Sequence, residues 1–579
     1  MHFLLPIKNR SWEQLKRTLP HLFSALFGAL AVLQLFFLLW LNLTQLPYHL
    51  GYDASCDYLR AYEMYKQGTL FPENWHDTTT SHLDAPGPLA ALLLHIVPNL
   101  FTAFGLANCV FLLGMVGFFW LILRELNVSL WASFLGISLL LCPNYVIVAN
   151  SNDLGYAACL LTSMQSYSGK FVLAFCFLWL WLVFANRKKW KAYHTGALVF
   201  CIFGCFVTGL SSGYFLAAYL LLPTLAVSFA LWLMREDHRW LLGPHTALTL
   251  GSLAAVAAGK LFAEHVIGFV SKDSSMALIS LSELADNLLA ALEGWFSLSA
   301  ALPPNDWTTV FSSKGLLYLL GAVVTIFLLG ALAVGCLQLM HTIRRTCAGE
   351  SVSISSGVVL LTITMLTNLL MLGLLNTRYG SSTYEDRYLI MVYCLSILLL
   401  AHLLSEGGLH LWIFRAMTVV LLLCLTIRTA ASDIAYTNTK INTSLMDAIT
   451  ATADALPSPV VFTCTETDEY NLMLRNMRCY DLAHVYKPIK SGVGDAVTLH
   501  ERYQGEADAA GIPWRIHFPH WGDYSYYDTA EEYSGPIVLI AEPLCFEALP
   551  TSLQEEFTFY SALNDDLAVY TCAINVLGV

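Results

Sequence analysis

Carboxylate side chains gather in one polar segment, residues 51–88, which is the part of the sequence best suited to acid–base chemistry. The segment reads GYDASCDYLRAYEMYKQGTLFPENWHDTTTSHLDAPGP. Its charged residues are Asp53, Asp57, Arg60, Glu63, Lys66, Glu73, Asp77 and Asp84. A positioned carboxylate can take the proton of an attacking hydroxyl group. We expect a functional carboxylate in this segment, with Asp53 as the first candidate and Asp57 as the second.

A helix must position these two residues. Residues 56–67 have an amphipathic helical pattern, and Gly68 is suited to end the helix. Two structural interpretations remain open at this stage. Asp53 is also a suitable helix cap, and Asp57 is also suited to a solvated helix face.

The composition indicates a membrane protein. Of the 579 residues, 56% are apolar and only 12% are charged, about half the charged share of a soluble domain, which is roughly 25%. An apolar run at 22–45 follows Lys8, Arg10, Lys16 and Arg17 and is long enough to span a bilayer. No small-residue cleavage site follows this run, so we interpret it as a membrane helix and not as a cleaved signal peptide.

About eleven membrane-length runs are present. They lie at 22–45, 106–123, 129–148, 170–186, 194–210, 213–233, 244–262, 316–340, 354–375, 387–404 and 409–428. A further apolar window at 88–104 is interrupted by His95, Pro98 and Asn99. Because of these interruptions we expect it to lie at the membrane face or to re-enter there. A full span would reverse the side of every later loop.

Charge asymmetry predicts the orientation. With the N-terminus in the cytoplasm, the inner loops hold 13 lysines and arginines and the longer outer loops hold 7, as the positive-inside rule requires. The prediction is an all-α polytopic membrane domain, residues 1–430, with outer loops 46–105 and 263–315.

The remaining residues, 431–579, have the character of a soluble extracytoplasmic domain. From residue 430 to the end there are 21 acidic and 7 basic residues, whereas the rest of the chain has a net charge of +2. Strand patterns at 460–464, 537–541 and 567–572 alternate with helical patterns at 436–456 and 551–557, which predicts a small α/β domain. Cys464 and Cys479 are our preferred disulfide pair there, since an outside location permits disulfides.

The order of motifs around residue 53 resembles the GT-C superfamily of integral-membrane glycosyltransferases, in particular the lipid A aminoarabinose transferases and protein mannosyltransferases. In that branch an Asp after the first helix is followed by a helix with an Arg-Glu-Met-like segment, and then by a Lys-Pro-Pro-Leu-like segment. Here Asp53, Glu63-Met64 and residues 85–88 (APGP) take those places. Two departures are that Ala54 replaces the usual acidic neighbour and that the Lys of the proline motif is missing.

The resemblance implies an inverting transfer of sugar from a polyprenyl-phosphate donor to an envelope glycan, lipid or protein on the outer face. Asp53 would be the general base. Asp153 matches a second acidic residue of relatives, and the Tyr-rich stretch ending in Arg387-Tyr388 also recurs in them. No cofactor is implied with certainty, although loop carboxylates could hold a divalent cation.

The phosphate leaving group needs positive partners. Candidates at expected outer helix ends are Lys170, Arg378 and Arg387. Each is equally suited to anchoring a helix end at the lipid headgroups, and Asp153 is equally suited to capping a loop. The aromatic stretch at 514–533 can stack on sugar rings, but such residues are more often domain core.

Several other functions are disfavoured. We find no nucleotide-binding glycine motif, no P-loop, no metal-spaced Cys or His set and no sign of a nucleic-acid partner. A transporter of lipid-linked glycans is a rival, but charges within the spans are few. A non-catalytic relative acting as receptor or assembly subunit is the other alternative, and Ala54 with the missing Lys keeps it open.

Overall fold

The computed structural model describes residues 5–574 except for short stretches. These are 73–74, 76–79, 145–155, 164, 188, 212–213, 236, 269–278, 280, 302–308, 310, 351–353, 375–385, 408, 410, 466, 492–495, 498–513, 518–533, 548 and 550. The described chain divides into two compact units. The first holds residues 1–42, 82–86 and 108–438, and the second holds residues 43–81, 87–107 and 439–579.

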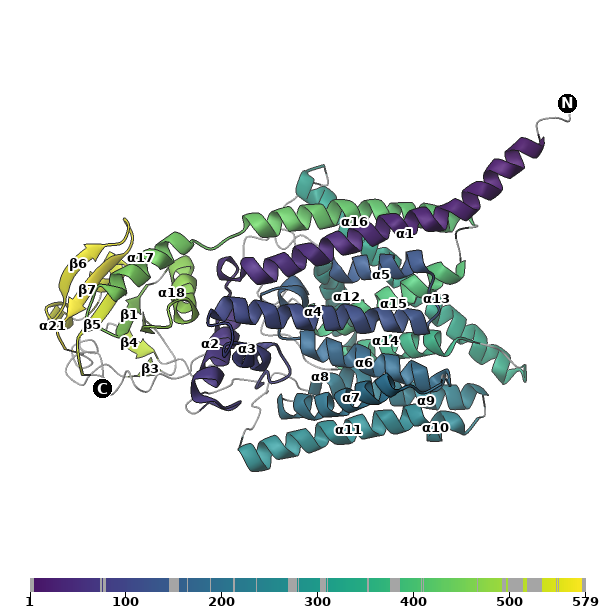
Figure 1. Ribbon diagram of the computed structural model, residues 1–579, viewed down its shortest axis with the longest axis horizontal. Helices are drawn as coiled ribbons and strands as arrows, with labels where there is room; N and C mark the ends of the chain where they lie inside the picture. Colours follow the sequence, from purple (N-terminus) through teal and green to yellow (C-terminus); the bar gives the residue numbers. More distant parts are fainter. Residues whose placement is uncertain are drawn as a thin grey trace. The chain divides into compact units, whose positions relative to one another are not determined.

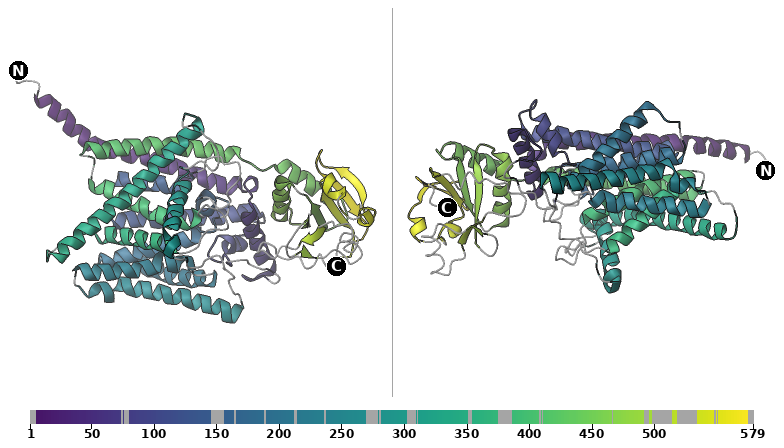
Figure 2. Two further views of the ribbon diagram at one scale, coloured as in Figure 1. Left: turned by 180° about the vertical axis from the view of Figure 1, so that it is seen from behind. Right: turned by 90° about the horizontal axis from the view of Figure 1, so that it is seen from below.

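The first unit is a helical bundle, shown from three sides in Figures 1 and 2. Its elements are α1 (Leu5–Thr44), α4 (Leu100–Glu125, which begins in the second unit), α5 (Leu130–Leu141), η2 (Ala157–Leu161), α6 (Ser168–Ala185), α7 (Ala192–Ser211), α8 (Tyr214–Leu216), η3 (Ala217–Leu221), α9 (Leu222–Arg235), α10 (Arg239–Leu242), α11 (Pro244–Phe262), η4 (Ala263–Ile267), η5 (Leu281–Glu283), α12 (Leu284–Leu298), α13 (Ser313–Cys347), α14 (Ser356–Leu374), η6 (Asp386–Leu389), α15 (Ile390–Gly407) and α16 (Trp412–Asn438).

Ten helices in the described part of the chain are long and apolar enough to cross a membrane. The predicted polytopic helical domain is therefore confirmed, and the chain is an integral membrane protein. The expected span at 129–148 is instead the 12-residue helix α5. The helix ends at Leu141 because Cys142 precedes Pro143, and a proline pushes the preceding residue out of helical conformation.

The window at 88–104 does not form one span. Helix α3 (Gly87–Leu93) has seven residues, and α4 begins only at Leu100. Seven helical residues rise about 10 Å, a third of the hydrocarbon thickness. Helix α3 is thus too short to cross the bilayer, in agreement with the expectation that this window does not span.

The second unit combines η1 (Leu46–Tyr48), α2 (Tyr52–Gln67) and α3 with the C-terminal residues. Its later elements are α17 (Thr443–Asp454), β1 (Val460–Cys464), α18 (Asp468–Tyr480), β2 (Val485–Ser491), β3 (Ala496–Val497), β4 (Trp514–His517), β5 (Ile537–Ala541), α20 (Pro543–Glu547), α21 (Thr551–Gln554), β6 (Thr558–Ala562) and β7 (Ala568–Cys572).

These strands form one sheet in the order β3-β4-β2-β1-β5-β7-β6. Strand β1 pairs in parallel with both β2 and β5, and the remaining pairs are antiparallel. Strands β1 and β5 are buried along their whole length, as expected for central parallel strands. The predicted α/β character of this part of the chain is confirmed.

The proposed Cys464–Cys479 disulfide is wrong. All 15 cysteines lie in the described residues and none of them forms a disulfide. Cys464 ends the central strand β1, where its thiol packs in the apolar core of the sheet. Cys479 lies on α18, and its thiol donates to the carbonyl of Asn476 at 3.3 Å. Both behave as small buried side chains.

Candidate functional site

The two candidate bases lie on the first two turns of α2. The N-cap of this helix is Gly51, which has an extended backbone. Asp53 follows two residues later, so it lies within the first turn and is not the N-cap residue of this helix. It is half-buried in the first turn, where the helix dipole favours a negative charge. Asp57 is buried and does not lie on a solvated face.

Helix α18 fixes the start of α2. The Asn476 side-chain amide donates to the Leu50 carbonyl at 3.2 Å, and its carbonyl oxygen accepts from the Ser55 hydroxyl. Ser55 also bonds to the carbonyl of Gly51 at 2.7 Å. The backbone around Asp53 is therefore held by side chains on both helices.

The charged residues near the start of α2 affect the pKa of Cys56. Burial raises the pKa of the Cys56 thiol well above its ordinary value, and the Asp53 carboxylate raises it further. Arg478 on α18 acts in the opposite direction, and Asp57 adds to the increase. Two carboxylates and one buried arginine thus lie around the Cys56 thiol near the start of α2.

In the first unit, Lys170 forms a buried ion pair with Asp84. Its ammonium nitrogen lies 3.1 Å from Asp84 Oδ1, and the two side chains are only 6% and 5% exposed. The ammonium also donates to the Ser166 carbonyl at 3.1 Å and lies 5.2 Å from the centre of the Tyr167 ring. Lys170 is at the N-terminal end of α6, as expected, but its charge is neutralised by Asp84 and does not anchor the helix at headgroups.

The ion pair between Asp84 and Lys170 depends on the glycine at position 169. A Cβ atom there would lie 1.7 Å from the Asp84 carbonyl oxygen, so only glycine allows the segment 82–86 to lie directly against α6. The Ser211 hydroxyl, at the end of α7, accepts from the Asp84 amide at 3.3 Å. The other Asp84 carboxylate oxygen is buried without a hydrogen-bond partner among the described residues.

A second cationic centre, which sequence analysis missed, is Arg428 on α16. Its guanidinium is buried and donates to Asn144 Oδ1 at 2.9 Å and to the Ser299 carbonyl. Within the described residues it has no carboxylate partner, and its Nη1 atom has no hydrogen-bond acceptor. The available sequence signal was an arginine at the end of the apolar run 409–428, since an ionisable residue in a membrane helix is a candidate functional residue.

The π-helix η2 connects the surroundings of Arg428 with those of Lys170. Asn144 donates to the Tyr393 hydroxyl at 3.1 Å, and the Tyr393 ring packs edge-on against Tyr156, which directly precedes η2. On the other side, the amide of Tyr167 bonds to the carbonyl of Cys159 in η2 at 3.1 Å. Single π-turns of this kind are frequent at functional sites. We call the residues joined here the η2 layer: Asp84, Asn144, Tyr156, Tyr167, Lys170, Tyr393 and Arg428.

Arg387 and Tyr388 lie on η6, which leads into α15 and therefore to Tyr393. The Arg387 guanidinium lies 5.3 Å from the centre of the Tyr388 ring. Tyr388 is buried and Arg387 is half-buried. The sequence thus identified one arginine at this end of α15, whereas the structure adds the buried Arg428 beside Tyr393.

Two candidates, Asp153 and Arg378, lie outside the described residues, as do residues 518–533 of the aromatic stretch. The described residues contain no group of three or more His, Cys, Asp or Glu side chains that could hold a metal ion. Metal assistance therefore stays a prediction, without a ligand set in this part of the chain.

The geometry can be compared with known proteins. No protein-family model matches the sequence, and no curated protein matches it. The structure is similar to that of ArnT from Cupriavidus metallidurans bound to undecaprenyl phosphate, with a TM-score of 0.53 and 12% identity, covering 96% of this chain and 99% of that one. The expected GT-C fold is therefore confirmed over almost the whole length of both chains.

Two other solved structures are similar at lower TM-scores. An oligosaccharyltransferase from Archaeoglobus fulgidus, tethered with an acceptor peptide, gives a TM-score of 0.45 at 14% identity, covering 80% of this chain and 63% of that one. The arabinofuranosyltransferase AftD from Mycobacteria gives a TM-score of 0.47 at 12% identity, covering 95% of this chain and 40% of that one.

Proposed function

We propose that this chain, which has the GT-C fold, is a membrane glycosyltransferase that takes its sugar from a polyprenyl-phosphate donor. The observation that carries the proposal is the full-length likeness to ArnT, whose structure contains undecaprenyl phosphate. A lipid-linked donor also agrees with the absence of a nucleotide-binding motif from the sequence. The acceptor is an envelope glycan, lipid or protein at the outer face, with the N-terminus in the cytoplasm.

The η2 layer supplies positive charge for the phosphate leaving group. Burying an arginine in a membrane protein is costly unless the charge has a use. Arg428 meets only neutral oxygens in the described residues, so an anionic ligand would provide the missing counter-charge. Arg387, with Tyr388 beside it, is the second phosphate partner that we propose, and Arg378 and Asp153 remain proposed substrate-binding residues.

Lys170 has a different role in this proposal. Because Asp84 already neutralises it, its main effect is to hold the segment 82–86 against α6. Its ammonium group can also reach a donor phosphate if the ligand competes with Asp84 for one of its three hydrogens.

Asp53 is the proposed general base. The acceptor hydroxyl must lose a proton as it attacks the anomeric carbon, and an ionised carboxylate can take that proton. Displacement of the prenyl phosphate by one direct attack inverts the anomeric carbon. Asp57 is the second candidate for the base, one turn further along α2.

The donor class is tested by binding of undecaprenyl phosphate to the purified chain in lipid nanodiscs. A hydrogen-bonded charge contributes about 1.5–3 kcal/mol, so we expect Arg428→Gln to weaken binding by more than tenfold and Arg428→Lys by less. Arg344→Gln is the matched control, because it removes an equal charge from an exposed position on α13. Equal affinities of Arg428→Gln and the control would contradict the assigned role of Arg428.

The alternative is a non-catalytic relative that binds the lipid without transferring sugar. It is favoured by Ala54 in place of the usual acidic neighbour of Asp53 and by the missing Lys of the proline motif. Binding without transfer by the wild-type chain would select this alternative.

A further inference from the structure

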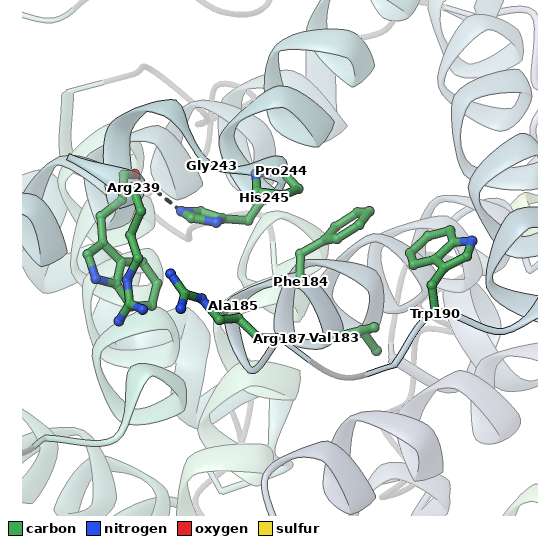
Figure 3. Close-up of a pocket in the computed structure, with 10 residues that line it drawn as sticks. Val183, Phe184, Ala185, Arg187, Trp190, Arg239, Gly243, Pro244 and His245 are labelled. Carbon is green, nitrogen blue, oxygen red and sulfur yellow. Dashed lines mark hydrogen bonds between the residues drawn. The ribbon is translucent and has the colours of Figure 1, made fainter. Parts of the chain in front are cut away.

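A separate cavity lies at the opposite end of α6 from Lys170. Its volume is about 380 Å³. Figure 3 shows the side chains around it, which come from the end of α6, the turn after it, α10 and the start of α11. Val183, which lines the cavity, is 13 residues from Lys170, so about 20 Å of helix separates the cavity from the η2 layer. The cavity therefore belongs to a different site.

Two arginines line this cavity. Arg187 is exposed, and the described residues offer it no carboxylate partner. Arg239 is partly neutralised, because its Nε atom lies 2.6 Å from Asp237 Oδ2. Lys189 and Lys191 are exposed in the turn that follows Arg187 but do not line the cavity. The electrostatic character of the cavity is therefore positive, and Arg187 is the cation available to a ligand.

Arg187 occupies an unusual backbone position. It follows the C-terminal end of α6 with a φ of 51°, in the left-handed region, and its amide bonds to the Phe184 carbonyl at 3.1 Å. Glycine is the usual residue at such a helix end, since a side chain there costs roughly 1–2 kcal/mol. The arginine is thus not explained by helix termination alone.

Three buried polar atoms of the lining residues have no hydrogen-bond partner among the described residues: Trp240 Nε1, His245 Nδ1 and Arg239 Nε. The last of these is the atom that is ion-paired with Asp237. His245 Nε2 lies 3.2 Å from the Trp240 carbonyl. Because a carbonyl only accepts, Nε2 carries the hydrogen, and Nδ1 of the neutral ring has a free lone pair. The residues that line the cavity thus carry one unused donor and one unused acceptor, and each unsatisfied buried group costs about 1–3 kcal/mol.

We propose that this cavity binds the headgroup of an anionic phospholipid whose phosphate is followed by a hydroxyl group, as in phosphatidylglycerol. The phosphate pairs with the guanidinium of Arg187, whose planar fork suits phosphate oxygens. The headgroup hydroxyl donates to His245 Nδ1 and accepts from Trp240 Nε1, which satisfies both groups.

The surroundings favour a lipid over a soluble ligand. Phe184, Trp190 and Trp240 line the cavity at the end of membrane-length helices, where aromatic residues concentrate in membrane proteins. Leu242, on the same short helix as Trp240, is 87% exposed and offers an apolar surface to an acyl chain. Basic pockets between membrane helices are known headgroup sites.

The test is native mass spectrometry of the full chain, with phosphatidylglycerol or phosphatidylcholine added to the detergent-purified protein. We expect one phosphatidylglycerol to bind more tightly than phosphatidylcholine. One arginine near a membrane surface contributes about 1 kcal/mol, so Arg187→Gln should weaken phosphatidylglycerol binding about fivefold, while Arg187→Lys largely retains it. Lys189→Gln removes the same charge from the same turn and should leave the affinity unchanged. Trp240→Phe removes the indole donor and should also weaken binding.

Three outcomes would overturn the proposal. One is an equal effect of Lys189→Gln and Arg187→Gln, which would indicate unspecific attraction to the basic turn. The second is unchanged binding in Arg187→Gln when size-exclusion profiles confirm that the variant is folded. The third is displacement of the lipid by millimolar inorganic phosphate, which would assign the cavity to a soluble anion.

Discussion

The Lys170 ammonium lies 3.1 Å from Asp84 Oδ1, in a position where both side chains are almost fully buried. These residues are 86 positions apart in the sequence, so the pair ties the segment 82–86 to the start of α6. Removing one partner of a buried pair leaves an uncompensated charge and costs about 3–5 kcal/mol, whereas replacing both is much less costly.

We therefore predict that Asp84→Asn and Lys170→Met each lower the thermal unfolding temperature strongly, and that the double variant recovers most of the loss. Thermal unfolding of the four proteins in one detergent completes a double-mutant cycle. Additive losses in the double variant would show that the two side chains do not stabilise each other.

Gly169 provides a second test of the same contact. A Cβ atom at this position would lie 1.7 Å from the Asp84 carbonyl oxygen, whereas one at Gly117 on α4 would have no neighbour within 4 Å. We predict that Gly169→Ala forces the segment 82–86 away from α6 and lowers the unfolding temperature, and that Gly117→Ala does not. Equal unfolding temperatures of the two variants would mean that the segment does not lie against α6.

The second unit should lose stability on acidification. Burial, and to a smaller extent the nearby Lys440, lowers the pKa of His49 from 6.5 to about 4. Between these two values the unfolded chain binds a proton that the folded chain does not, so the free energy of unfolding falls as the pH falls. From pH 7 to pH 5 this loss is about 2 kcal/mol at 1.36 kcal/mol per pH unit.

The His49→Gln variant should lack this part of the pH dependence, because it has no group that titrates there. Unfolding of both proteins at pH 7 and at pH 5, followed by tryptophan fluorescence, measures the difference. If the free energy of unfolding fell by the same amount in wild type and variant, His49 would not be the group responsible.

The central strands of the sheet illustrate what the sequence can predict. Strands β1 and β5 are short runs that are apolar except for Thr463, each directly follows a proline, and both were predicted with the bounds that the structure has. Strand β2, VYKPIKS, contains Pro488 and two lysines, a composition typical of edge strands and loops. It was missed because it gains its place by pairing with β1 and β4, which its local sequence does not indicate.

The same limit applies to the candidate site. Asp53 and Arg387 follow from local motifs, and Lys170 follows from its place at a helix end. The Asp84–Lys170 pair depends on contacts between distant segments, which no spacing reveals. Arg428 was accessible from the sequence as an arginine at the end of an apolar run, but its partners Asn144 and Ser299 come from two other parts of the chain.

The central claim is that this chain transfers sugar from a lipid phosphate with Asp53 as its base, and one measurement tests it most directly. Membranes that contain wild-type protein, Asp53→Asn or Asp57→Asn at equal levels are compared for sugar transferred from the lipid-linked pool to envelope material. A general base contributes roughly 10²- to 10⁴-fold, so Asp53→Asn should lose at least a hundredfold of the wild-type rate. Transfer at the wild-type rate by Asp53→Asn, or no transfer by the wild-type protein, would contradict the account.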